Sequence, residues 1–565
     1  MPDVAFGGTQ RPGRRNSEFA LSRELPCPRW LVVTPARIRW LVVALAFLLP
    51  LGFAAFTGHA WEDYFITLRA SRNLVEGHGL VFQPGERVHT FTSPLGVLIP
   101  ALCTALAGPG EEVRALWFFR IFSAALLAAS ARLIWRRADT LRLGALGRTV
   151  LFGLLLADAK LTDFATNGME TAILVFFMLL LWTELEAPAG PRIRWLGSAL
   201  GGLMWTRPDA FVLAGALIAP HLLFRRPAEG SSAFPWRQLW RGALLGGLIY
   251  LPWIAWAWWY YGSPIPNTII AKSAFAPVIH LTDMLLVPWR VLTGQRLGGD
   301  LFMPAYAVFG GWPVQLYGFA RILTVIAAFA WLVPQLPAAG RRASLAVLLG
   351  AFYLCAITAF PWYIPPWPVL ASIAVAFVFD AAYASASAVR RPAIRAAARI
   401  AGALTVLMAA ATFAATAWQM RVQQRVVETG VRRDIGEWLR AHAAPSDTVF
   451  LEPLGYIGYF SGLRMYDFPG LSSPDVVRTV REGARSYTEV IARLQPQWIV
   501  LRPYEMIRDE FVDRPVLRDY QLVKSWSARP QLDAIRFLPG RRWCEFESQY
   551  LLFQRKPAAE TARPR

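Results

Sequence analysis

The sequence predicts a polytopic α-helical membrane protein with about eleven transmembrane helices and a C-terminal α/β domain outside the membrane. Three observations lead to this prediction. Hydrophobic residues make up 55% of the 565 residues and the mean hydropathy is +0.36, so the chain is more apolar than most soluble domains. Apolar runs of about 18 or more residues recur, and that length spans a bilayer core. The last part of the chain is more polar and mixes helical with strand patterns.

The charge of the chain fits a membrane topology. The formal net charge is +20, which in a soluble protein would suggest a nucleic-acid partner. Here the arginines gather in short loops between apolar runs, as the positive-inside rule describes, so we expect no nucleic acid. The four cysteines (Cys27, Cys103, Cys355 and Cys544) form no CxxC or other metal-ligand spacing, and the six histidines show no HExxH pattern.

The order of basic and apolar segments predicts the topology. Residues 1–36 are rich in Pro, Gly and Arg and are interpreted as a disordered basic cytoplasmic tail. If the short segment 93–108 crossed the membrane, the basic segment 132–148 would face outward, so we expect one long outer loop, 58–112, with 93–108 at the interface. The membrane domain, 37–418, is expected to have spans near 40–57, 113–134, 148–164, 169–185, two flanking 205–210, then 242–260, 314–334, 343–359, 363–386 and 398–417, with 261–312 as an outer loop.

One expected span contains charges that do not suit a bilayer. Asp158 and Lys160 both fall inside 148–164. Charged groups inside a membrane are costly and can mark a functional site. The boundaries of this span are therefore the least consistent with the pattern.

Residues 419–565 are predicted to form an extracytoplasmic α/β domain. "DTVFLEP", "QWIVLRP" and "QYLLFQRK" have the pattern of strands, and "VVETGVRRDIGEWLRAHA" that of an amphipathic helix. The domain contains neither GxGxxG nor a P-loop, so no nucleotide site is expected there.

The predicted topology gathers reactive side chains on the outer face. The adjacent carboxylates Glu62 and Asp63 follow the first span, and outer cations and aromatics follow along the chain, whereas the inner loops carry mainly Arg. Such a set suits transfer of a sugar from a lipid phosphate. Arg and Lys would neutralise the phosphate leaving group, a carboxylate would take the proton of the acceptor hydroxyl, and aromatic rings would stack on the sugar.

Five segments in order resemble the GT-C superfamily of polyprenyl-phosphate-sugar glycosyltransferases, most closely the branch of the mycobacterial terminal arabinofuranosyltransferases. The first is "WEDYFITLRASRNLVEGHGLVFQPGERVHTFTSPLGVL", which resembles the first outer loop of that family. The others are "TNGMETAI" (166–173), "TRPDAFVLA" (206–214), "YYGSPIPNTIIAKS" (260–273) and "FPWYIPPWPVL" (360–370). The resemblance covers nearly the whole chain after residue 37 and implies a GT-C fold.

The resemblance also implies residue roles. In that family the acidic pair of the first loop supplies the catalytic base, which points to Asp63. Glu62 stands where relatives more often have Asp, and its role is left open between a partner of Asp63, an acceptor contact and a metal ligand. The candidates for the donor phosphate are Arg120, Lys272 and Arg207, and those for the substrate are Arg69, His78, Asn167, Glu170, Asn267, Trp362 and Tyr363.

Simpler interpretations stand beside these roles. Arg120 could snorkel to the interface, Arg207 could form a structural ion pair with Asp209, and Asn267 could only shape a loop. His78 suits a polar loop, and the aromatics of 360–370 suit an interfacial belt. The C-terminal domain would bind the acceptor or only cap the site.

The leading hypothesis is an inverting glycosyltransferase of the bacterial inner membrane. It would move a sugar, arabinofuranose or another pentose by resemblance, from a polyprenyl phosphate to an extracytoplasmic glycan, lipid or protein hydroxyl. A transporter or flippase for lipid or lipid-linked sugar is the alternative, but the inverted repeats it predicts are not visible. A non-catalytic scaffold would leave the acidic pair and the outer cations without a shared role. The sequence identifies no cofactor with certainty. A carboxylate pair could hold Mg²⁺ or Mn²⁺, although no full ligand set is visible.

Overall fold

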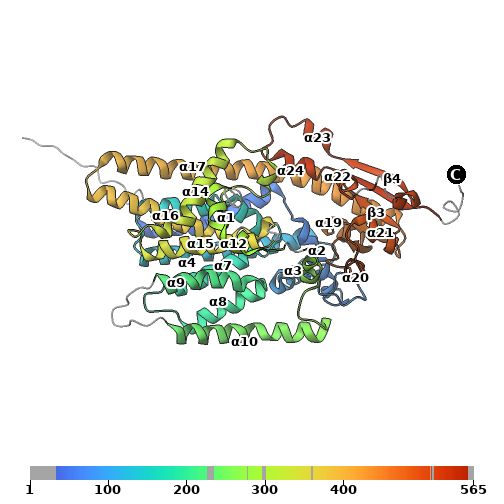
Figure 1. The fold of residues 1–565 in the computed structure, drawn as a ribbon, viewed down its shortest axis with the longest axis horizontal. Coiled ribbons are helices and arrows are strands. Elements are labelled where there is room, and N and C mark those ends of the chain that lie inside the picture. Colours follow the sequence, from blue (N-terminus) through green and yellow to red (C-terminus); the bar gives the residue numbers. More distant parts are fainter. Residues whose placement is uncertain are drawn as a thin grey trace, which may run out of the picture.

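The computed structural model describes residues 34–224, 235–275, 278–294, 301–357, 360–509, 511 and 515–557. They form a helical part and a smaller part built on a sheet, which lies beyond one end of the long helices (Figure 1). The tail expected over 1–36 lies outside the described residues as far as residue 33. Its last residues already belong to the first helix, which begins at Pro35.

Seventeen α-helices, α1 to α17, make up the helical part among the described residues. Two of them are buried on nearly all sides, namely α7 and the first half of α16, as expected for helices at the centre of a bundle. The helices are α1 (Pro35–Thr57), α2 (Glu62–Val75), α3 (Pro94–Ala107), α4 (Glu112–Thr140), α5 (Ala145–Leu156), α6 (Ala159–Thr166), α7 (Thr171–Leu185), α8 (Ile193–Thr206), α9 (Ala210–Leu223), α10 (Trp236–Tyr261), α11 (Asn267–Ser273), α12 (Leu281–Leu285), α13 (Val287–Thr293), α14 (Val314–Phe329), α15 (Ala338–Ala356), α16 (Pro366–Ala388) and α17 (Pro392–Val422).

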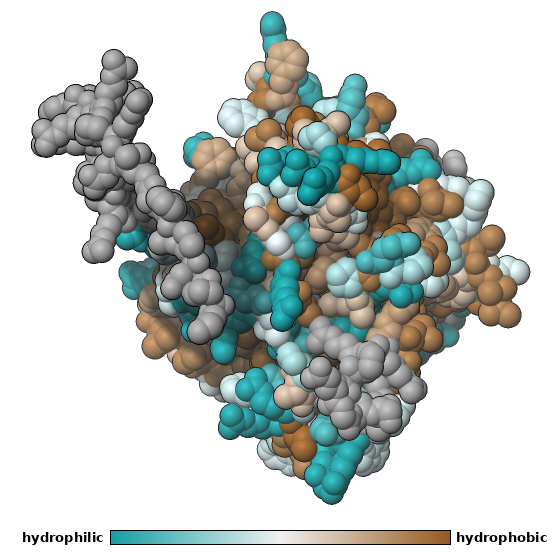
Figure 2. Space-filling model, turned by 90° about the vertical axis from the view of Figure 1, so that its left-hand side faces the viewer, coloured by the Kyte–Doolittle hydropathy of each residue, from teal (hydrophilic) through white to brown (hydrophobic). Residues whose placement is uncertain are grey.

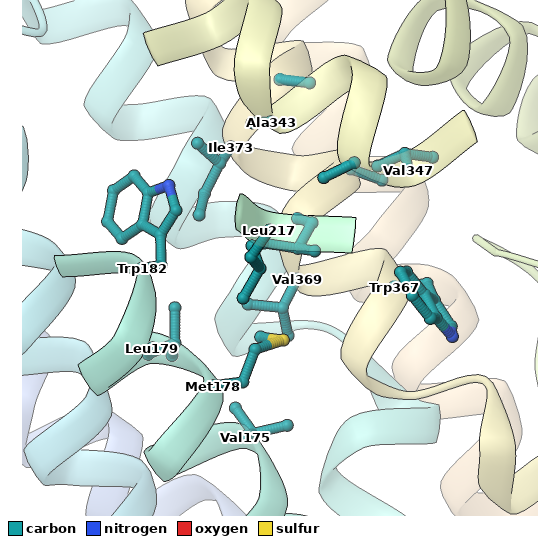
Figure 3. Packing of buried hydrophobic residues seen from close by; sticks show 14 of the residues in the cluster. Val175, Met178, Leu179, Trp182, Leu217, Ala343, Val347, Trp367, Val369 and Ile373 are labelled. Carbon is teal, nitrogen blue, oxygen red and sulfur yellow. The ribbon is translucent and has the colours of Figure 1, made fainter. Parts of the chain in front are cut away.

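The main apolar core lies where α7, α9, α15 and α16 meet (Figure 3). Met178 of α7, Leu217 of α9, Val347 of α15 and Val369 of α16 are all at most 3% exposed. Small residues let the helices approach closely. A Cβ at Gly350 of α15 would collide with the Trp367 ring of α16, so glycine is needed at that crossing.

Seven helices in the described part of the chain are long and apolar enough to cross a membrane, and the bent pair α6–α7 would make an eighth. The expected count of eleven is therefore not confirmed, because α5 and α9 are apolar but shorter than a bilayer requires. Figure 2 looks onto the end of the helical part opposite the sheet. Hydrophilic and hydrophobic side chains are mixed over that end, and hydrophobic ones gather along both sides of it.

The expected span 148–164 is wrong as a single helix. The chain breaks after α5, and Asp158 begins α6 by accepting a hydrogen bond from the N–H of Leu161 at 2.9 Å. The axes of α6 and α7 then differ by 118°. A capping side chain is expected where a helix begins, so Asp158 marks a break in the chain. The break explains why Asp158 and Lys160 are inconsistent with one continuous span.

The two expected outer loops contain helices. The segment 58–112 includes α2 and α3, and α3 packs against both α2 and α4. The segment 261–312 includes α11, α12 and α13. Two side chains of α13, Val287 and Val291, are at most 1% exposed and belong to the main apolar core, so this segment is not a solvated loop.

No linker separates the helical part from the sheet part. α17, a π-helical segment η4 (Gln423–Arg433) and α18 (Asp434–His442) form one helix of 51 residues, so the boundary expected at 418/419 falls inside a helix. π-helical turns are rare and are frequently found at functional sites. This segment carries the buried side chains of Glu428 and Arg432.

The sheet has five strands in the order β2-β1-β3-β5-β4. β1 is parallel to β2 and β3, whereas β5 is antiparallel to β3 and β4. The three predicted strands are confirmed as β1, β3 and β5, and β2 and β4 were not predicted. The elements are β1 (Thr448–Leu451), α19 (Gly455–Ser461), β2 (Arg464–Asp467), α20 (Pro474–Arg481), α21 (Tyr487–Leu494), β3 (Trp498–Leu501), α22 (Pro503–Arg508), β4 (Tyr520–Ser527), α23 (Arg529–Asp533), α24 (Arg541–Phe546) and β5 (Gln549–Arg555).

Helices cover both faces of this sheet. In β1, Val449 and Leu451 pack with residues of α18 and α19, whereas Phe450 between them packs with α20 and α21. The alternation follows from the two-residue period of a strand. The face with α18 and α19 is the one that meets α2, whose Ile66 packs into the apolar cluster on that face.

Candidate active site

The carboxylates Glu62 and Asp63 form the first turn of α2. Trp61 before them has an extended backbone (φ −72°, ψ 150°), so the helix begins at Glu62. The partial positive charge of a helix N-terminus favours acidic side chains there. Oε1 of Glu62 accepts a hydrogen bond from the backbone N–H of Gly455 in α19. A Cβ at Gly455 would overlap the carbonyl oxygen of Glu62, so only glycine permits this approach of the sheet part to α2.

The two carboxylates line a cavity of about 1280 Å³, counting its open mouth. The helical part and the sheet part each supply one wall, and residues 304–309 close the space between them. The helical wall consists of Trp61, Glu62, Asp63, Lys160, Phe360, Pro361, Trp362 and Ile364 together with 304–309, and the C-terminal wall of Arg432, Glu452, Pro453, Arg502, Tyr504, Trp543, Phe546 and Glu547.

Two lysines bring positive charge to the helical wall. Lys160, which follows the break between α5 and α6, lines the cavity directly. Lys272 of α11 lies beside Asp63, and its charge lowers the pKa of that carboxyl. Its Nζ lies 4.9 Å from the centroid of the Phe360 ring and 5.9 Å from that of Trp362, which are cation–π distances.

The acidic pair retains protons more strongly than free carboxyls do. Burial and then the Asp63 charge raise the pKa of Glu62 well above its usual value. Burial also raises the pKa of Asp63, while Lys272 and a hydrogen bond from Glu62 oppose that rise. Glu452 across the cavity raises both values further. Two adjacent carboxyls titrate as a coupled pair, and here the pKa of Glu62 is raised more strongly than that of Asp63, because Lys272 lies beside Asp63.

The charges of the C-terminal wall are paired among themselves. Arg432 donates to both oxygens of Glu428 at 3.0 Å and to Glu547, and Arg502 donates to Glu547 at 2.9 and 3.0 Å, to Glu505 at 2.7 Å and to Glu452. Burial alone would raise the pKa of Glu547, but the two guanidiniums lower it to about 2. These buried ion pairs fix the wall in one arrangement.

Aromatic rings join the two walls. Tyr306 stacks on Trp543 of the C-terminal wall, with ring centroids 3.8 Å apart, and on Trp61 of the helical wall at 5.4 Å. Trp61 also lies 6.0 Å from Trp362. The backbone of Tyr306 has φ +60°, an uncommon value for a residue other than glycine, and the two stacked neighbours hold it there.

Arg120 lies behind α2 and does not line the cavity. Its Nη2 donates to the carbonyl of His59 at 2.7 Å and its Nε to that of Thr166 at 3.0 Å. Nδ1 of His59 in turn lies 2.7 Å from Oδ1 of Asp163, and both side chains are at most 3% exposed. This buried cluster attaches the chain just before α2 to the end of α6.

Arg207 forms the ion pair with Asp209 that the sequence suggested. Its Nε donates to Oδ1 of Asp209 at 3.0 Å, and its Nη1 lies 3.3 Å from Oε1 of Glu170. The guanidinium carbon lies 4.2 Å from the centroid of the Tyr363 ring. Arg207, Glu170 and Tyr363 thus form one cluster, and none of the three lines the cavity.

The other predicted substrate residues lie in structural contacts. Arg69 is 2% exposed and donates to Gln83 and to the carbonyls of residues 458, 462 and 463. Asn267 donates to the carbonyls of 470 and 471, so both side chains attach the helical part to the sheet part. The carbonyl of Asn167 accepts from Trp61 N–H at 2.8 Å, and His78 is an exposed neighbour of Glu76. None of these four lines the cavity.

The structure thus brings together Glu62, Asp63, Lys272 and Trp362 of the predicted residues. It adds Lys160, which the sequence marked only as a charge misplaced in a span. It also adds Arg432, Arg502, Glu452 and the aromatics of the C-terminal wall. Sequence reasoning missed these because an Arg or Glu in a mixed polar segment gives no signal until the fold places it beside α2.

The donor set for a divalent cation is small. Among the described residues no group of three or more His, Cys, Asp and Glu is arranged to hold a metal ion. Mg²⁺ and Mn²⁺ prefer several oxygen ligands. Glu62 already accepts from Gly455, and Glu452 from Arg502, so Glu62 and Asp63 alone are a poor fit for such an ion.

Comparison with known proteins agrees with the resemblance seen in the sequence. The chain is 30% identical over 232 residues to a terminal β-(1→2)-arabinofuranosyltransferase of Mycobacterium tuberculosis, over 38% of this chain and 35% of that protein. It is 28% identical over 239 residues to the protein of the same name from Corynebacterium glutamicum, over 38% of this chain and 33% of that protein. The matches therefore span about a third of the length of each relative.

The fold is that of ArnT, a GT-C protein. The crystal structure of ArnT from Cupriavidus metallidurans bound to undecaprenyl phosphate aligns over 94% of this chain and all of ArnT, with a TM-score of 0.51 and 15% identity. The apo structure gives a TM-score of 0.52 at 14% identity. Residues 418–550 also match a family described as a domain of unknown function (DUF8728). The chain is thus a multi-pass membrane protein with the GT-C fold of ArnT, and part of it is similar in sequence to terminal arabinofuranosyltransferases.

Proposed function

We propose that this protein is an inverting membrane glycosyltransferase that moves a sugar from a polyprenyl phosphate to the hydroxyl of an extracytoplasmic acceptor. The observation that supports this most is the position of Asp63. It is a half-buried carboxylate on the wall of a large cavity, next to Glu62 and Lys272, and Lys160 and several aromatic rings line the same cavity. A base, cations for a phosphate and ring faces for a sugar are the groups that this reaction needs.

The reaction is a single displacement at the anomeric carbon. The acceptor hydroxyl oxygen attacks that carbon, and its proton passes to the Asp63 carboxylate. The bond from the anomeric carbon to the phosphate oxygen breaks, and the electron pair leaves on the polyprenyl phosphate. Lys272 and Lys160 neutralise the charge that develops on the leaving phosphate, inside a partly buried site where such interactions are strong. Attack on the face opposite the leaving group inverts the anomeric configuration.

Two relatives suggest the substrates. The names of the curated relatives specify β-(1→2) transfer of arabinofuranose, and ArnT was crystallised with undecaprenyl phosphate. We infer that the donor is a polyprenyl-phosphate pentose and that the acceptor is a glycan hydroxyl. Arabinofuranose is the first pentose to test. Among the initial phosphate candidates, Lys272 keeps this role, whereas Arg120 and Arg207 act by holding the elements around the cavity.

The location follows from the same proposal. The cavity would open on the outer face of a bacterial inner membrane, with the N-terminus cytoplasmic and residues from about 419 onward outside. A flippase is the second candidate. It would use the same lipid, but it gives no role to the adjacent carboxylates Glu62 and Asp63 on the cavity wall.

The test is sugar transfer by the purified protein in nanodiscs with labelled polyprenyl-phosphate arabinofuranose, other pentoses and hexoses. Asp63→Asn should lower kcat about 10³-fold, because it removes the base while keeping size and shape. Asp533→Asn is the control, since that carboxylate is 62% exposed and paired with Arg541. Equal turnover of wild type and Asp63→Asn would exclude Asp63 as the base. Movement of lipid across the bilayer without turnover of any donor would favour the flippase, and retention of activity in EDTA would exclude a dissociable cation.

A further inference from the structure

The C-terminal wall differs from the helical wall in its charge. Its two guanidiniums, on Arg432 and Arg502, are surrounded by four carboxylates, which belong to Glu428, Glu452, Glu505 and Glu547. A phosphate brought to this wall would meet more negative than positive charge. The lysines lie on the helical wall. The donor phosphate therefore belongs on the helical side, and the C-terminal wall suits a neutral polar ligand.

The same wall also carries the aromatic rings of Tyr504 and Phe546, which line the cavity. Tyr504 and Phe546 stack with centroids 4.5 Å apart and an interplanar angle of 29°, and both are only partly buried. The Arg502 guanidinium carbon lies 5.1 Å from the Tyr504 ring centroid and 5.8 Å from that of Phe546. Phe309, at 4.8 Å, supports Phe546 from the other side of the cavity rim. These contacts hold the rings in place before any ligand arrives.

One carboxylate stands beside these rings. Glu452 is the carboxylate of the wall that is 42% exposed, and one of its oxygens, Oε2, accepts from Arg502. The ion pair fixes its orientation while the side chain faces the cavity. A carboxylate accepts hydrogen bonds from neighbouring hydroxyls, and a ring face packs on the apolar face of a sugar.

We propose that Glu452, Tyr504 and Phe546 form the acceptor subsite, and that its ligand is a terminal sugar of a neutral glycan. This inference rests on the proposed function and assigns a substrate to one wall. In an inverting displacement the hydroxyl must approach the anomeric carbon from the side opposite the leaving phosphate. With the phosphate at the lysines of the helical wall, the acceptor enters from the C-terminal wall. Asp63 lies on the cavity between these two groups and receives the proton.

Steady-state kinetics of the full chain in nanodiscs test this assignment. Tyr504→Ala and Phe546→Ala should each raise the acceptor KM at least tenfold, measured with a synthetic arabinofuranosyl trisaccharide, and change the donor KM less than twofold. Tyr504→Phe keeps the ring and should stay within threefold of the wild-type acceptor KM. Phe537→Ala, at a side chain that is 90% exposed in the same part of the chain, controls for loss of a phenylalanine. An unchanged acceptor KM, or a donor KM that rises equally, would overturn the proposal.

A direct titration separates failure of this inference from failure of the proposed function. The trisaccharide, and maltotriose as a comparison, are titrated by calorimetry into wild type and Glu452→Gln. The Gln variant keeps the shape of the side chain, so it remains usable even if the alanine variants do not fold. Binding to wild type that weakens at least fivefold in Glu452→Gln supports the subsite even where no donor is turned over. Absence of binding to wild type would overturn the subsite. Transfer by wild type with unaltered kinetics in all variants would keep the function and reject the subsite.

Discussion

The two walls of the cavity use charge in opposite ways. On the helical side, Lys160 and Asp63 line the cavity and Lys272 lies beside Asp63, and the three residues come from separate helices. On the C-terminal wall, Arg432 and Arg502 are tied to carboxylates in a continuous network. A network of ion pairs maintains the shape of a wall, whereas a cation or carboxylate on the cavity surface can act on a ligand. The comparison assigns chemistry to the helical wall and shape recognition to the C-terminal wall.

The largest effect should come from breaking the network. Glu547→Gln removes the carboxylate that Arg432 and Arg502 share, which leaves buried positive charge less compensated. Loss of one partner from a buried ion pair costs about 3–5 kcal/mol, so the thermal unfolding midpoint should fall by several degrees. Glu545→Gln is the matched control, because that residue pairs with Arg541 near the surface and should cost about 1 kcal/mol or less. Equal midpoints for the two variants would show that the network does not hold the wall.

A smaller effect, on activity alone, is expected on the helical wall. Lys272→Met removes a cation from the phosphate side and should lower kcat/KM for the donor about 100-fold, with little change in the unfolding midpoint. The same change raises the pKa of Asp63 further, since the lysine charge now lowers it. The acidic limb of the pH–rate profile should therefore move to higher pH. Lys524→Met, on the exposed strand β4, serves as the control, and a donor kcat/KM within threefold of wild type in Lys272→Met would contradict the assignment.

The smallest effect sharpens the role of Glu62. Its raised pKa means that the folded protein keeps a proton that the unfolded chain loses above about pH 4.3, so stability falls as the pH rises through this window. Gln does not titrate and can still accept from Gly455. Glu62→Gln should thus match wild type at pH 4 and become the more stable protein towards pH 8, while it keeps most of the transfer activity. Unfolding midpoints at pH 4, 6 and 8 check this, with Glu76→Gln at the exposed end of α2 as the control. A stability difference that stays constant with pH would argue against a raised pKa of Glu62.

The sequence by itself determined the membrane class, the acidic pair after the first span and three of the five strands. Each has a local signal. Long apolar runs indicate membrane spans directly, and the two carboxylates are adjacent in the chain. Strands such as Trp498–Leu501 consist of continuous apolar residues. Lys272 was also identified, because it lies within a family-like segment.

Only the tertiary structure decided which residues share the cavity. Asp63 and Arg502 are far apart in the chain, and their proximity depends on the glycine at 455 and on the helix that runs unbroken from α17 to α18. The break before Lys160 likewise depends on a cap at Asp158 that the apolar pattern concealed. Arg69 and Arg120 were chosen as charges on the outer side, yet their guanidiniums bond to backbone carbonyls. The sequence does not distinguish an arginine that binds a ligand from one that binds backbone carbonyls. The surrounding fold determines which of these two roles the side chain has.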